Sequence, residues 1–414
     1  MDIYEPAEDS YLLEKQIKKY AAGRVLDVGT GSGIQALTAV TFPNIREVVA
    51  VDINQKAVEE LQKIAEFRKL RKLKVLHSDL FEKVEAKFNL ILFNPPYLPQ
   101  DRGIDDPALY GGKKGWEIIE RLISQASRYL MEDGKILLLF STLTNKKKVE
   151  EILEEHLFEW KQVASQKLSF EELFVYEIQK TELLRELERH HLEGVEYFAR
   201  GKRGVVYKAV LQKGKLIKTH FPSQEELKKT EEDVVVKVER GESKAIERIS
   251  NEAKWLKKLN QHGIGPRLFL YQKSYQKSYP KSYLILEFIE GELILDWIQK
   301  KETSKSEIRE VLVNILRQCF ALDELGVNKG EMHHPLKHVI VNKKNRPVMI
   351  DFERCKETDK PQNVTQFVEF ISRIKQDLAK KDFSINSEEL QELGKEYKTK
   401  FSESSLEKII KQFS

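Results

Sequence analysis

The sequence predicts an α/β domain with a mostly parallel sheet, followed by a second domain of α+β type. Between residues 24 and 178, short apolar strands alternate with helical segments, an order typical of parallel α/β sheets. From about residue 193 a β-rich stretch precedes a helix and a strand pair, and residues 292–414 are mostly helical. The length of 414 residues agrees with two domains.

The apolar runs and the helical periodicity place the elements of the first domain. Strands are expected at residues 24–28, 47–51, 74–76, 89–93, 135–140 and 173–178. Helices are expected at residues 33–41, 54–70, 115–130 and 146–156. We therefore place the first domain at residues 1–180, a charged connecting helix at 181–192 and the second domain at 193–414.

Composition narrows the class of protein. The chain is 41% hydrophobic and 33% charged, and its net charge of +4 is too small to indicate nucleic-acid binding by itself. Two cysteines give no disulfide framework and suggest a reducing compartment. Acidic residues stand where a signal peptide needs Lys or Arg, and no apolar run approaches membrane-spanning length. We expect a cytoplasmic protein with no membrane partner.

A glycine-rich loop follows the first strand. In VLDVGTGSG, residues 25–33, three glycines let the backbone turn sharply and approach a ligand. Their G-x-G-x-G spacing differs from the G-x-G-x-x-G of dinucleotide sites. Asp52 ends the second strand, where its carboxylate can accept ribose hydroxyls, and Asp27 suits a cationic ligand end. Asp79 and the Leu80 backbone can contact an adenine edge. S-adenosylmethionine fits all these positions.

A proline-rich motif, Asn94-Pro95-Pro96-Tyr97, follows the strand at 89–93. The prolines fix φ and lack an N–H group, and they keep Asn94 out of the helical region. The Asn94 side-chain oxygen and the Pro95 carbonyl can accept two hydrogen bonds, while Tyr97 offers a stacking face. A planar –NH2 group complements them, with its lone pair turned toward the methyl group of the cofactor. Carboxamides and the exocyclic amines of nucleobases remain open as acceptors.

Five motifs occur in order in the first domain: YEPAEDSYLL (4–13), DVGTGSG, SDLF, NPPY and ALYGGKKGWEII (108–119). Over residues 1–180 they resemble the HemK-like glutamine methyltransferases, above all the archaeal and eukaryotic branch that modifies a translation release factor. The resemblance implies a Rossmann-like class I methyltransferase sheet, parallel with an antiparallel C-terminal strand. It also implies N5-methylation of a glutamine in a Gly-Gly-Gln loop.

The resemblance further assigns roles to individual residues. Glu5, Pro6 and Ser10 would fold over the cofactor, and the loop at 111–115 would lie near the substrate entrance. The residues expected to receive the glutamine are Asn94, Pro95, Pro96 and Tyr97. The residues expected to bind S-adenosylmethionine are Ser10, Asp27, Gly29, Thr30, Gly31, Gly33, Asp52, Ile53, Asp79, Leu80 and Asn94. Members of this branch often work with a small zinc-binding partner subunit.

The second domain contains motifs found in ATP-binding kinases. Residues 198–209 read as two strands around a hairpin that contains Gly201 and Gly204. Lys237 lies in a third strand and Glu252 on the following helix, a pair that orients ATP phosphates in kinases. Asp351 stands where kinases hold a metal-binding aspartate, so it is the expected Mg²⁺ ligand. Over residues 193–370 this order resembles the minimal, atypical kinases of the RIO and archaeal type.

The second domain also departs from that pattern. Ala199 replaces the first glycine of the loop. In EMHHPLKHVIV, residues 331–341, alignment on the apolar end puts His333 at the catalytic aspartate and His338 at the metal-binding asparagine. Glu331 lies nearby with a different spacing. We therefore expect Mg-ATP binding with weak or absent phosphate transfer, and a pseudokinase scaffold is the alternative.

Three functions remain open from the sequence. The first is a protein glutamine methyltransferase joined to a kinase-like module. The second is a methyltransferase for the exocyclic amine of adenine or guanine in a nucleic acid, with the second domain as an adaptor. The Tyr- and Lys-rich residues 271–283 suit such an adaptor, or a solvated hairpin. The third is an active Ser/Thr protein kinase that the first domain regulates, and the intact NPPY motif argues against it.

Overall fold

The structure is a computed structural model that describes residues 2–100, 110–201, 204–212, 231–239, 246–273 and 282–413. It divides into two compact units. The first unit contains residues 1–197 and 209–216, and the second contains residues 198–208 and 217–414. Parts of three predicted motifs lie outside the described residues: 108–109 of the motif at 108–119, 202–203 of the hairpin at 198–209, and 274–281 of the Tyr- and Lys-rich residues 271–283.

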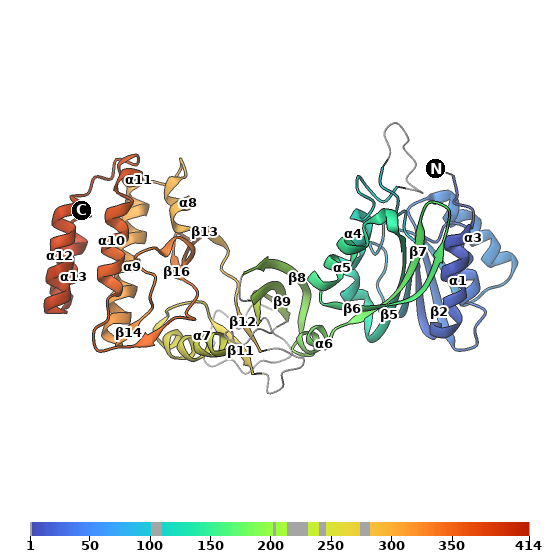
Figure 1. Cartoon of the computed structure of the whole chain (residues 1–414), viewed down its shortest axis with the longest axis horizontal. Helices are drawn as coiled ribbons and strands as arrows, with labels where there is room; N and C mark the ends of the chain where they lie inside the picture. Colours follow the sequence, from blue (N-terminus) through green and yellow to red (C-terminus); the bar gives the residue numbers. More distant parts are fainter. Residues whose placement is uncertain are drawn as a thin grey trace. The chain divides into compact units, whose positions relative to one another are not determined.

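A seven-stranded sheet forms the centre of the first unit (Figure 1). Its order is β3-β2-β1-β4-β5-β7-β6. The strands are β1 (Gly23–Val28), β2 (Ile45–Asp52), β3 (Leu73–His77), β4 (Phe88–Phe93), β5 (Leu130–Ser141), β6 (Phe158–Lys167) and β7 (Glu172–Lys180). The helices are α1 (Glu8–Tyr20), α2 (Ile34–Ala39), α3 (Gln55–Phe67), α4 (Glu117–Tyr129), α5 (Lys146–Glu155) and α6 (Glu182–Arg189).

Strand directions confirm the predicted sheet. The strands β3, β2, β1, β4 and β5 pair in parallel, and β7 runs antiparallel to β5. The central strands are buried on both faces, which explains their continuous apolar sequences. The sequence analysis missed β6, which pairs with β7 and alternates mostly half-buried and exposed residues. An edge strand of this kind has no continuous apolar run by which to recognise it.

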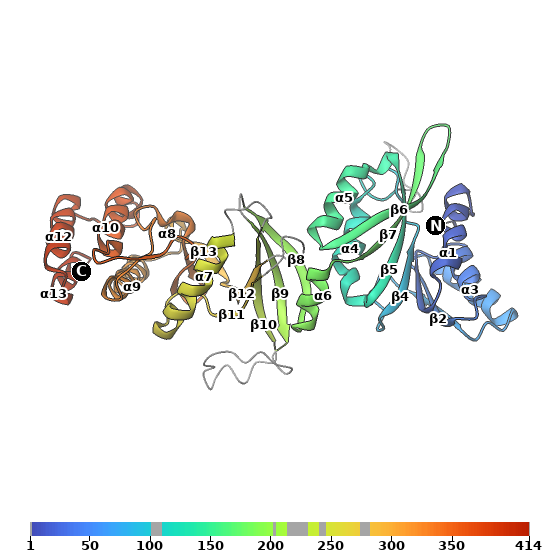
Figure 2. The ribbon, with the colours of Figure 1, turned by 60° about the horizontal axis from the view of Figure 1, so that its bottom comes forward.

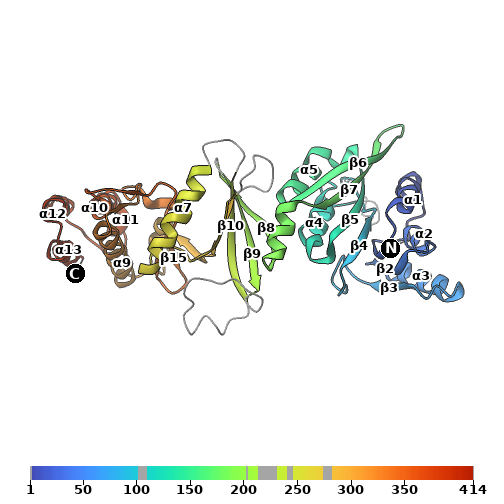
Figure 3. The same cartoon turned by 90° about the horizontal axis from the view of Figure 1, so that it is seen from below.

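Helices cover both faces of this sheet. Figure 3 shows α1, α2 and α3 on one face and α4 and α5 on the other. Helix α1, which lies N-terminal to the first predicted strand, buries Leu12, Leu13 and Ile17 in the core that also contains Val25 and Leu90. This position brings the start of the chain to the carboxyl ends of the strands.

The connecting helix is shorter than expected and packs on the first unit. Predicted over 181–192, α6 ends at Arg189, and its leucines Leu183, Leu184 and Leu187 are buried. Lys180 is fully buried, and its Nζ donates to the Leu130 carbonyl at 2.9 Å and to both Glu188 carboxylate oxygens at 2.7 Å. The helix is therefore part of the first unit rather than a free linker.

The second unit contains a five-stranded sheet in the order β11-β12-β10-β9-β8, followed by helices (Figure 2). The unit boundary runs through β8 and β9. The strands are β8 (Leu192–Arg200), β9 (Gly204–Gln212), β10 (Glu231–Glu239), β11 (Leu268–Gln272), β12 (Tyr283–Glu287), β13 (Gly291–Leu293), β14 (Val327–Asn328), β15 (Val339–Asn342), β16 (Pro347–Met349) and β17 (Lys356–Glu357). The helices are α7 (Ile246–Leu259), α8 (Ile294–Gln299), α9 (Lys305–Glu324), α10 (Asn363–Arg373), α11 (Lys375–Ala379), α12 (Ser387–Lys400) and α13 (Glu403–Lys411).

One apolar core joins the sheet and the helices of the second unit. It runs from Leu284 on β12 through Leu312 and Leu316 on α9 to Phe367 on α10 and Ile409 on α13. The predicted order of β-rich stretch, helix, strand pair and helical remainder is confirmed. Among the described residues, no helix combines the length and the apolar character that crossing a membrane requires.

Candidate functional site

A cavity of about 440 Å³ opens beyond the carboxyl ends of β1, β2 and β4. In the sheet, β2 and β3 lie on one side of β1, and β4 and β5 lie on the other. The strand order therefore reverses between β1 and β4, which is where open α/β sheets bind ligands. The cavity wall contains most of the residues predicted to bind the cofactor and the acceptor. These are Ser10, Asp27, Gly29, Thr30, Gly31, Asp52, Ile53, Asp79, Leu80, Asn94, Pro95, Pro96 and Tyr97.

The glycine loop has the backbone geometry that the sequence predicted. Gly29, Gly31 and Gly33 all have positive φ, which other L-residues adopt only with strain. A Cβ atom on Gly29 would meet no atom within 4 Å, so its backbone faces open space. Gly33 is absent from the cavity wall and packs against Leu61 of α3 instead. Gly33 therefore has a packing role, and its predicted contact with the cofactor stays a prediction.

Asp27 is the last residue but one of β1 and is buried on the cavity wall. Its Oδ2 accepts hydrogen bonds from Thr30 Oγ1 at 2.6 Å and from the Ala36 backbone N–H at 3.1 Å. Burial raises the pKa of Asp27 to about 7, although these two hydrogen bonds oppose the rise. A cationic ligand group beside it would return the side chain to its ionised form.

Asp52 and Asp79 lie at the ends of the next two strands. The Asp52 carboxylate accepts from the Gly31 backbone N–H and from the Asn54 backbone N–H, both at 2.8 Å. Each of its oxygens keeps a second lone pair, as ribose hydroxyls would require. Asp79 pairs with Arg121 of α4 at 2.9 Å, and both side chains lie on the cavity wall.

The NPPY motif lies directly after β4, and Asn94 has one amide atom without a partner. Asn94 Nδ2 donates to Asp9 Oδ2 at 3.1 Å. Asn94 Oδ1 is buried and accepts no hydrogen bond within the described part of the chain. A buried acceptor without a donor is costly, so an unpaired one on a cavity wall indicates where a donor of the ligand binds. The hydroxyl of Thr144, which lies just after β5, donates to the Tyr97 carbonyl at 3.0 Å and so helps to hold the motif in place.

The predicted entrance loop packs against this motif. The Gly111 N–H donates to the Leu98 carbonyl at 3.0 Å, and a Cβ on Gly111 would lie 2.2 Å from the Pro96 carbonyl oxygen. A Cβ on Gly115 would lie 2.5 Å from the Tyr97 carbonyl oxygen. Only glycine therefore fits at these positions. Gly111 and Gly112 lie on the cavity wall, in agreement with a place near the acceptor.

Sequence reasoning missed several residues of the cavity. Tyr4, Asp9, Gln35 and Arg121 lie on its wall, whereas Glu5 and Pro6 are absent from it. Of the three residues expected to fold over the cofactor, Ser10 alone is there. The sequence contained a signal for the burial of Asp9. Asp9 stands three and four positions before Leu12 and Leu13 on the same helix, so it lies on the face that these buried leucines share.

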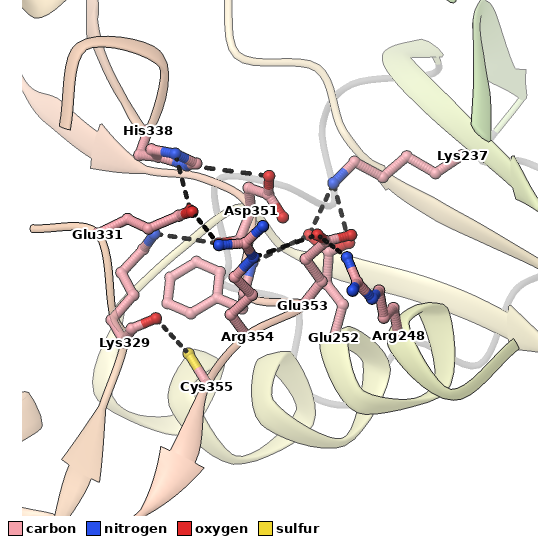
Figure 4. Close-up of polar contacts among 11 residues, drawn as sticks. Lys237, Arg248, Glu252, Lys329, Glu331, His338, Asp351, Glu353, Arg354 and Cys355 are labelled. Carbon is pink, nitrogen blue, oxygen red and sulfur yellow. Dashed lines mark hydrogen bonds and ion pairs between the residues drawn. The ribbon is translucent and has the colours of Figure 1, made fainter. Parts of the chain in front are cut away.

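The second unit holds a separate cluster of charged residues (Figure 4). Lys237 Nζ of β10 lies 2.8 Å and 2.9 Å from the two carboxylate oxygens of Glu252 on α7, and Glu252 is 2% exposed. Burial would lower the pKa of Lys237, but the charges of Glu252 and Asp351 raise it above its usual value. The predicted Lys–Glu pair is therefore formed.

Asp351 follows β16 with a positive φ of 63°. Lys329 Nζ donates to the Asp351 carbonyl at 3.0 Å, and Asp351 Oδ2 lies 3.8 Å from His338 Nδ1. Burial would raise the pKa of Asp351, but Lys237 and Lys329 hold it below its usual range. His338 Nε2 in turn lies 3.1 Å from Glu331 Oε2.

The structure brings Glu331, rather than His333, beside His338 and Asp351. Glu331 also pairs with Arg354, so both of its carboxylate oxygens have partners, as Figure 4 shows. His333 is exposed, and its alignment with the catalytic aspartate of kinases stays a prediction. Gly201 is exposed at the hairpin and donates its N–H to the Gly204 carbonyl at 2.9 Å. The described residues contain no group of three or more His, Cys, Asp or Glu arranged to hold a metal ion.

Comparison with known proteins gives matches to the first unit. The family model "Methyltransferase small domain" matches residues 7–171. A protein of Methanocaldococcus jannaschii, provisionally named protein N5-glutamine methyltransferase, is 39% identical over 179 residues, which are 42% of this chain and 90% of that protein. The release factor glutamine methyltransferase of Deinococcus radiodurans is 34% identical over 137 residues, and the match spans 31% of this chain and 49% of that enzyme.

Among solved structures, the Mtq2–Trm112 complex of E. cuniculi, described as responsible for methylation of the termination factor eRF1, is 27% identical with a TM-score of 0.36. The match covers 44% of this chain and 100% of that one. Residues 7–171, which the family model matches, contain β1 to β6, the glycine loop and the NPPY motif described above. The chain therefore belongs to the protein N5-glutamine methyltransferase family, and it is an S-adenosylmethionine-dependent methyltransferase.

Proposed function

We propose that the first unit transfers a methyl group from S-adenosylmethionine to the side-chain nitrogen of a glutamine, in the Gly-Gly-Gln loop of a translation release factor. The observation that carries this proposal is the buried, unpartnered Oδ1 of Asn94 on the cavity wall. A carboxamide –NH2 supplies the donor that this oxygen lacks. The names of the M. jannaschii and D. radiodurans relatives support glutamine as the acceptor.

The residues of the cavity fit the cofactor. The open backbone at Gly29 leaves room for a ligand, and the carboxylates of Asp27 and Asp52 lie where an ammonium group and ribose hydroxyls would need them. Asp79 and Leu80 would contact the adenine. When bound, S-adenosylmethionine supplies an electrophilic methyl group on a sulfonium.

The chain's own contribution is to position the acceptor. Asn94 Oδ1 and the Pro95 carbonyl would each accept one hydrogen of the glutamine –NH2 group, and Tyr97 would pack against its amide plane. An amide nitrogen is a weak nucleophile because its lone pair is delocalised into the carbonyl. Holding both hydrogens directs that lone pair out of the plane and stabilises the positive charge that develops on nitrogen. The nitrogen would gain the methyl group as the carbon–sulfur bond of the sulfonium breaks to leave a thioether, and it would lose one proton to solvent.

The exocyclic amine of adenine or guanine is a second candidate acceptor, since it presents the same planar –NH2 group. Methyl transfer from labelled cofactor to release factor, tRNA and DNA, measured in parallel with the full-length chain, separates the candidates. Incorporation into release factor alone, located on its glutamine, supports the proposal. Incorporation into nucleic acid alone contradicts it.

We also propose that the second unit is a kinase-like module that binds Mg-ATP. The Lys237–Glu252 pair and the nearby Asp351 support this, and Asp351 would hold the cation together with the nucleotide phosphates. Glu331 already pairs with His338 and Arg354, which makes it a poor base for activating a hydroxyl group. Phosphate transfer is therefore expected to be weak or absent, against the alternative of an active Ser/Thr kinase.

The resemblance of the first unit to the release-factor branch further suggests a small zinc-binding partner subunit. Co-expression and co-purification from a host that makes such a subunit tests this. A partner that elutes with the full-length chain at equal molar amounts supports it, and a fully active chain purified alone contradicts it.

A further inference from the structure

Asp9 is the only described side chain bonded to the amide of Asn94, and no proposed step uses it. It lies in the first turn of α1, is 4% exposed, and lines the cavity. Its Oδ2 accepts from Asn94 Nδ2 and from the Tyr4 hydroxyl, each at 3.1 Å. Its Oδ1 accepts from the Ser10 backbone N–H at 2.5 Å.

These contacts bear on a problem that every amide side chain presents. The oxygen and the nitrogen of an asparagine amide have nearly the same shape, and rotation of the group by half a turn exchanges an acceptor for two donors. A substrate that presents an –NH2 group for methylation needs the oxygen of the Asn94 amide, rather than its nitrogen, toward the cavity. The Asn94 backbone, although fixed by the following proline, does not select between the two orientations.

Asp9 supplies that selection. A carboxylate only accepts hydrogen bonds, so the atom of Asn94 that faces it must be the nitrogen. The Tyr4 hydroxyl and the Ser10 N–H hold the carboxylate in place from its other sides. Burial and the charge of Asp9 raise the pKa of Tyr4, so Tyr4 remains a donor. Asn94 Oδ1 is then left without a partner, on a residue of the cavity wall.

We infer that Asp9 is a positioning residue that fixes the Asn94 amide with its oxygen toward the substrate group that receives the methyl. It thereby selects substrate groups that donate hydrogen bonds over groups that only accept them. The inference rests on the proposed function. It adds a specificity determinant: the site excludes a carboxylate, such as glutamate in place of glutamine, because two acceptors would face each other without a hydrogen between them.

Asp9→Asn in the full-length chain tests the inference. The new amide can donate to Asn94 Oδ1, which turns the Asn94 –NH2 toward the cavity. We expect kcat for a Gly-Gly-Gln peptide to fall at least about tenfold, as loss of acceptor positioning does, with cofactor affinity changed by less than about threefold. We also expect a Gly-Gly-Glu peptide to inhibit Asp9→Asn more strongly than wild type, because the turned amide now donates.

Two further variants guard against misfolding. Tyr4→Phe removes one hydrogen bond from the same carboxylate oxygen and should lower kcat by a smaller factor, about two- to fivefold. Glu14→Gln changes an acid on the same helix that bonds Thr38 outside the cavity, and it should leave kcat unchanged. If Asp9→Asn does not fold, Tyr4→Phe decides the question, and a wild-type kcat in that variant contradicts the inference.

Three outcomes overturn the inference: wild-type kcat in Asp9→Asn, equal losses of kcat and cofactor affinity, or unchanged inhibition by the glutamate peptide. A wild-type protein that methylates no glutamine peptide contradicts the proposed function instead. Asp9→Asn is then measured with the acceptor that wild type does methylate, and an unchanged kcat there overturns the inference separately.

Discussion

The two charged sites of this chain differ in how their polar atoms are satisfied. On the wall of the cavity in the first unit, Asn94 Oδ1 has no hydrogen-bond partner among the described residues. In the cluster of the second unit, Lys237 pairs with Glu252, and Glu331 pairs with both His338 and Arg354, while Asp351 Oδ1 is buried without a hydrogen-bond partner among the described residues. The first site lacks a donor for an amide oxygen, whereas in the second most charged groups pair with one another and one carboxylate oxygen of Asp351 stays unpaired.

The comparison teaches that the hydrogen-bond partners of a polar side chain, and not its residue type alone, decide which chemistry it can perform. A buried acceptor without a partner, on a residue that lines a cavity, has a cost that a hydrogen-bond donor of the ligand would remove, so we expect the first site to bind a specific ligand. A carboxylate already held by an arginine and a histidine gains less from abstracting a proton. We therefore expect chemistry in the first unit and at most nucleotide binding in the second. Four predictions test this difference, from the largest expected effect to the smallest.

Asn94→Ala should lower turnover at least about a hundredfold while cofactor affinity stays nearly unchanged, because the side chain holds the acceptor more than the cofactor. Steady-state rates and calorimetric titration of cofactor measure the two quantities. Asn89→Ala is the matched control, since Asn89 lies on the same strand and bonds the Arg24 backbone away from the cavity. Equal losses of rate and cofactor affinity in Asn94→Ala would show that the residue is misassigned.

Asp52→Ala should weaken cofactor binding by about 1.5–3 kcal/mol, the usual range for hydrogen bonds to a charged group. Asp52→Asn keeps one acceptor for the Gly31 or Asn54 N–H and should lie between Ala and wild type. Calorimetric titration gives the affinities, and turnover at saturating cofactor should remain close to wild type. An unchanged affinity in Asp52→Ala would remove the ribose assignment.

Cofactor binding should depend on pH through Asp27. Its pKa of about 7 in the free protein means that the side chain is largely protonated below that pH. A cationic cofactor favours the ionised form, so affinity should rise about tenfold between pH of about 6 and about 8, with a proton released on binding. The ammonium of the cofactor titrates nearby and opposes the rise, so the comparison that counts is with Asp27→Asn. Identical pH profiles for the two proteins would contradict the assignment.

Mg-ATP should raise the melting temperature of the full-length chain by a few degrees, as expected for a weak ligand at about ten times its Kd. Lys237→Ala alone is a poor test, because it leaves the buried Glu252 without its partner at a cost of about 3–5 kcal/mol. The double variant Lys237→Met with Glu252→Gln removes both charges and should abolish the shift. No shift in wild type indicates a scaffold that binds no nucleotide, and strong phosphate transfer lost in Asp351→Ala indicates an active kinase.

Much of the first unit could be predicted from the sequence, because its central strands are buried on both faces and appear as continuous apolar runs. The cavity followed, since strand ends and a glycine loop have local signatures. The β6 edge strand and the packing of α6 on the first unit could not be predicted from the sequence, because both depend on contacts with other elements of the fold.

The same reason explains which site residues were missed. Asp9 is 85 positions from Asn94, and nothing local indicates their contact. In the second unit, alignment put His333 at the catalytic aspartate of kinases, whereas the structure brings Glu331, which has positive φ, beside His338. Local motifs therefore predict the elements and the ligand class, while the orientation of each side chain depends on contacts that the fold creates.

The central claim is that Asn94 presents an acceptor to a planar –NH2 group of glutamine. The most direct measurement is methyl incorporation from labelled cofactor into release factor that carries Gly-Gly-Gln or Gly-Gly-Glu in its loop, with tRNA and DNA beside them, located by mass spectrometry. We predict one methyl group on the glutamine nitrogen, none on the glutamate variant, and loss of transfer with Asn94→Ala. Incorporation into nucleic acid in place of the glutamine, or equal incorporation into the glutamate variant, would contradict the account.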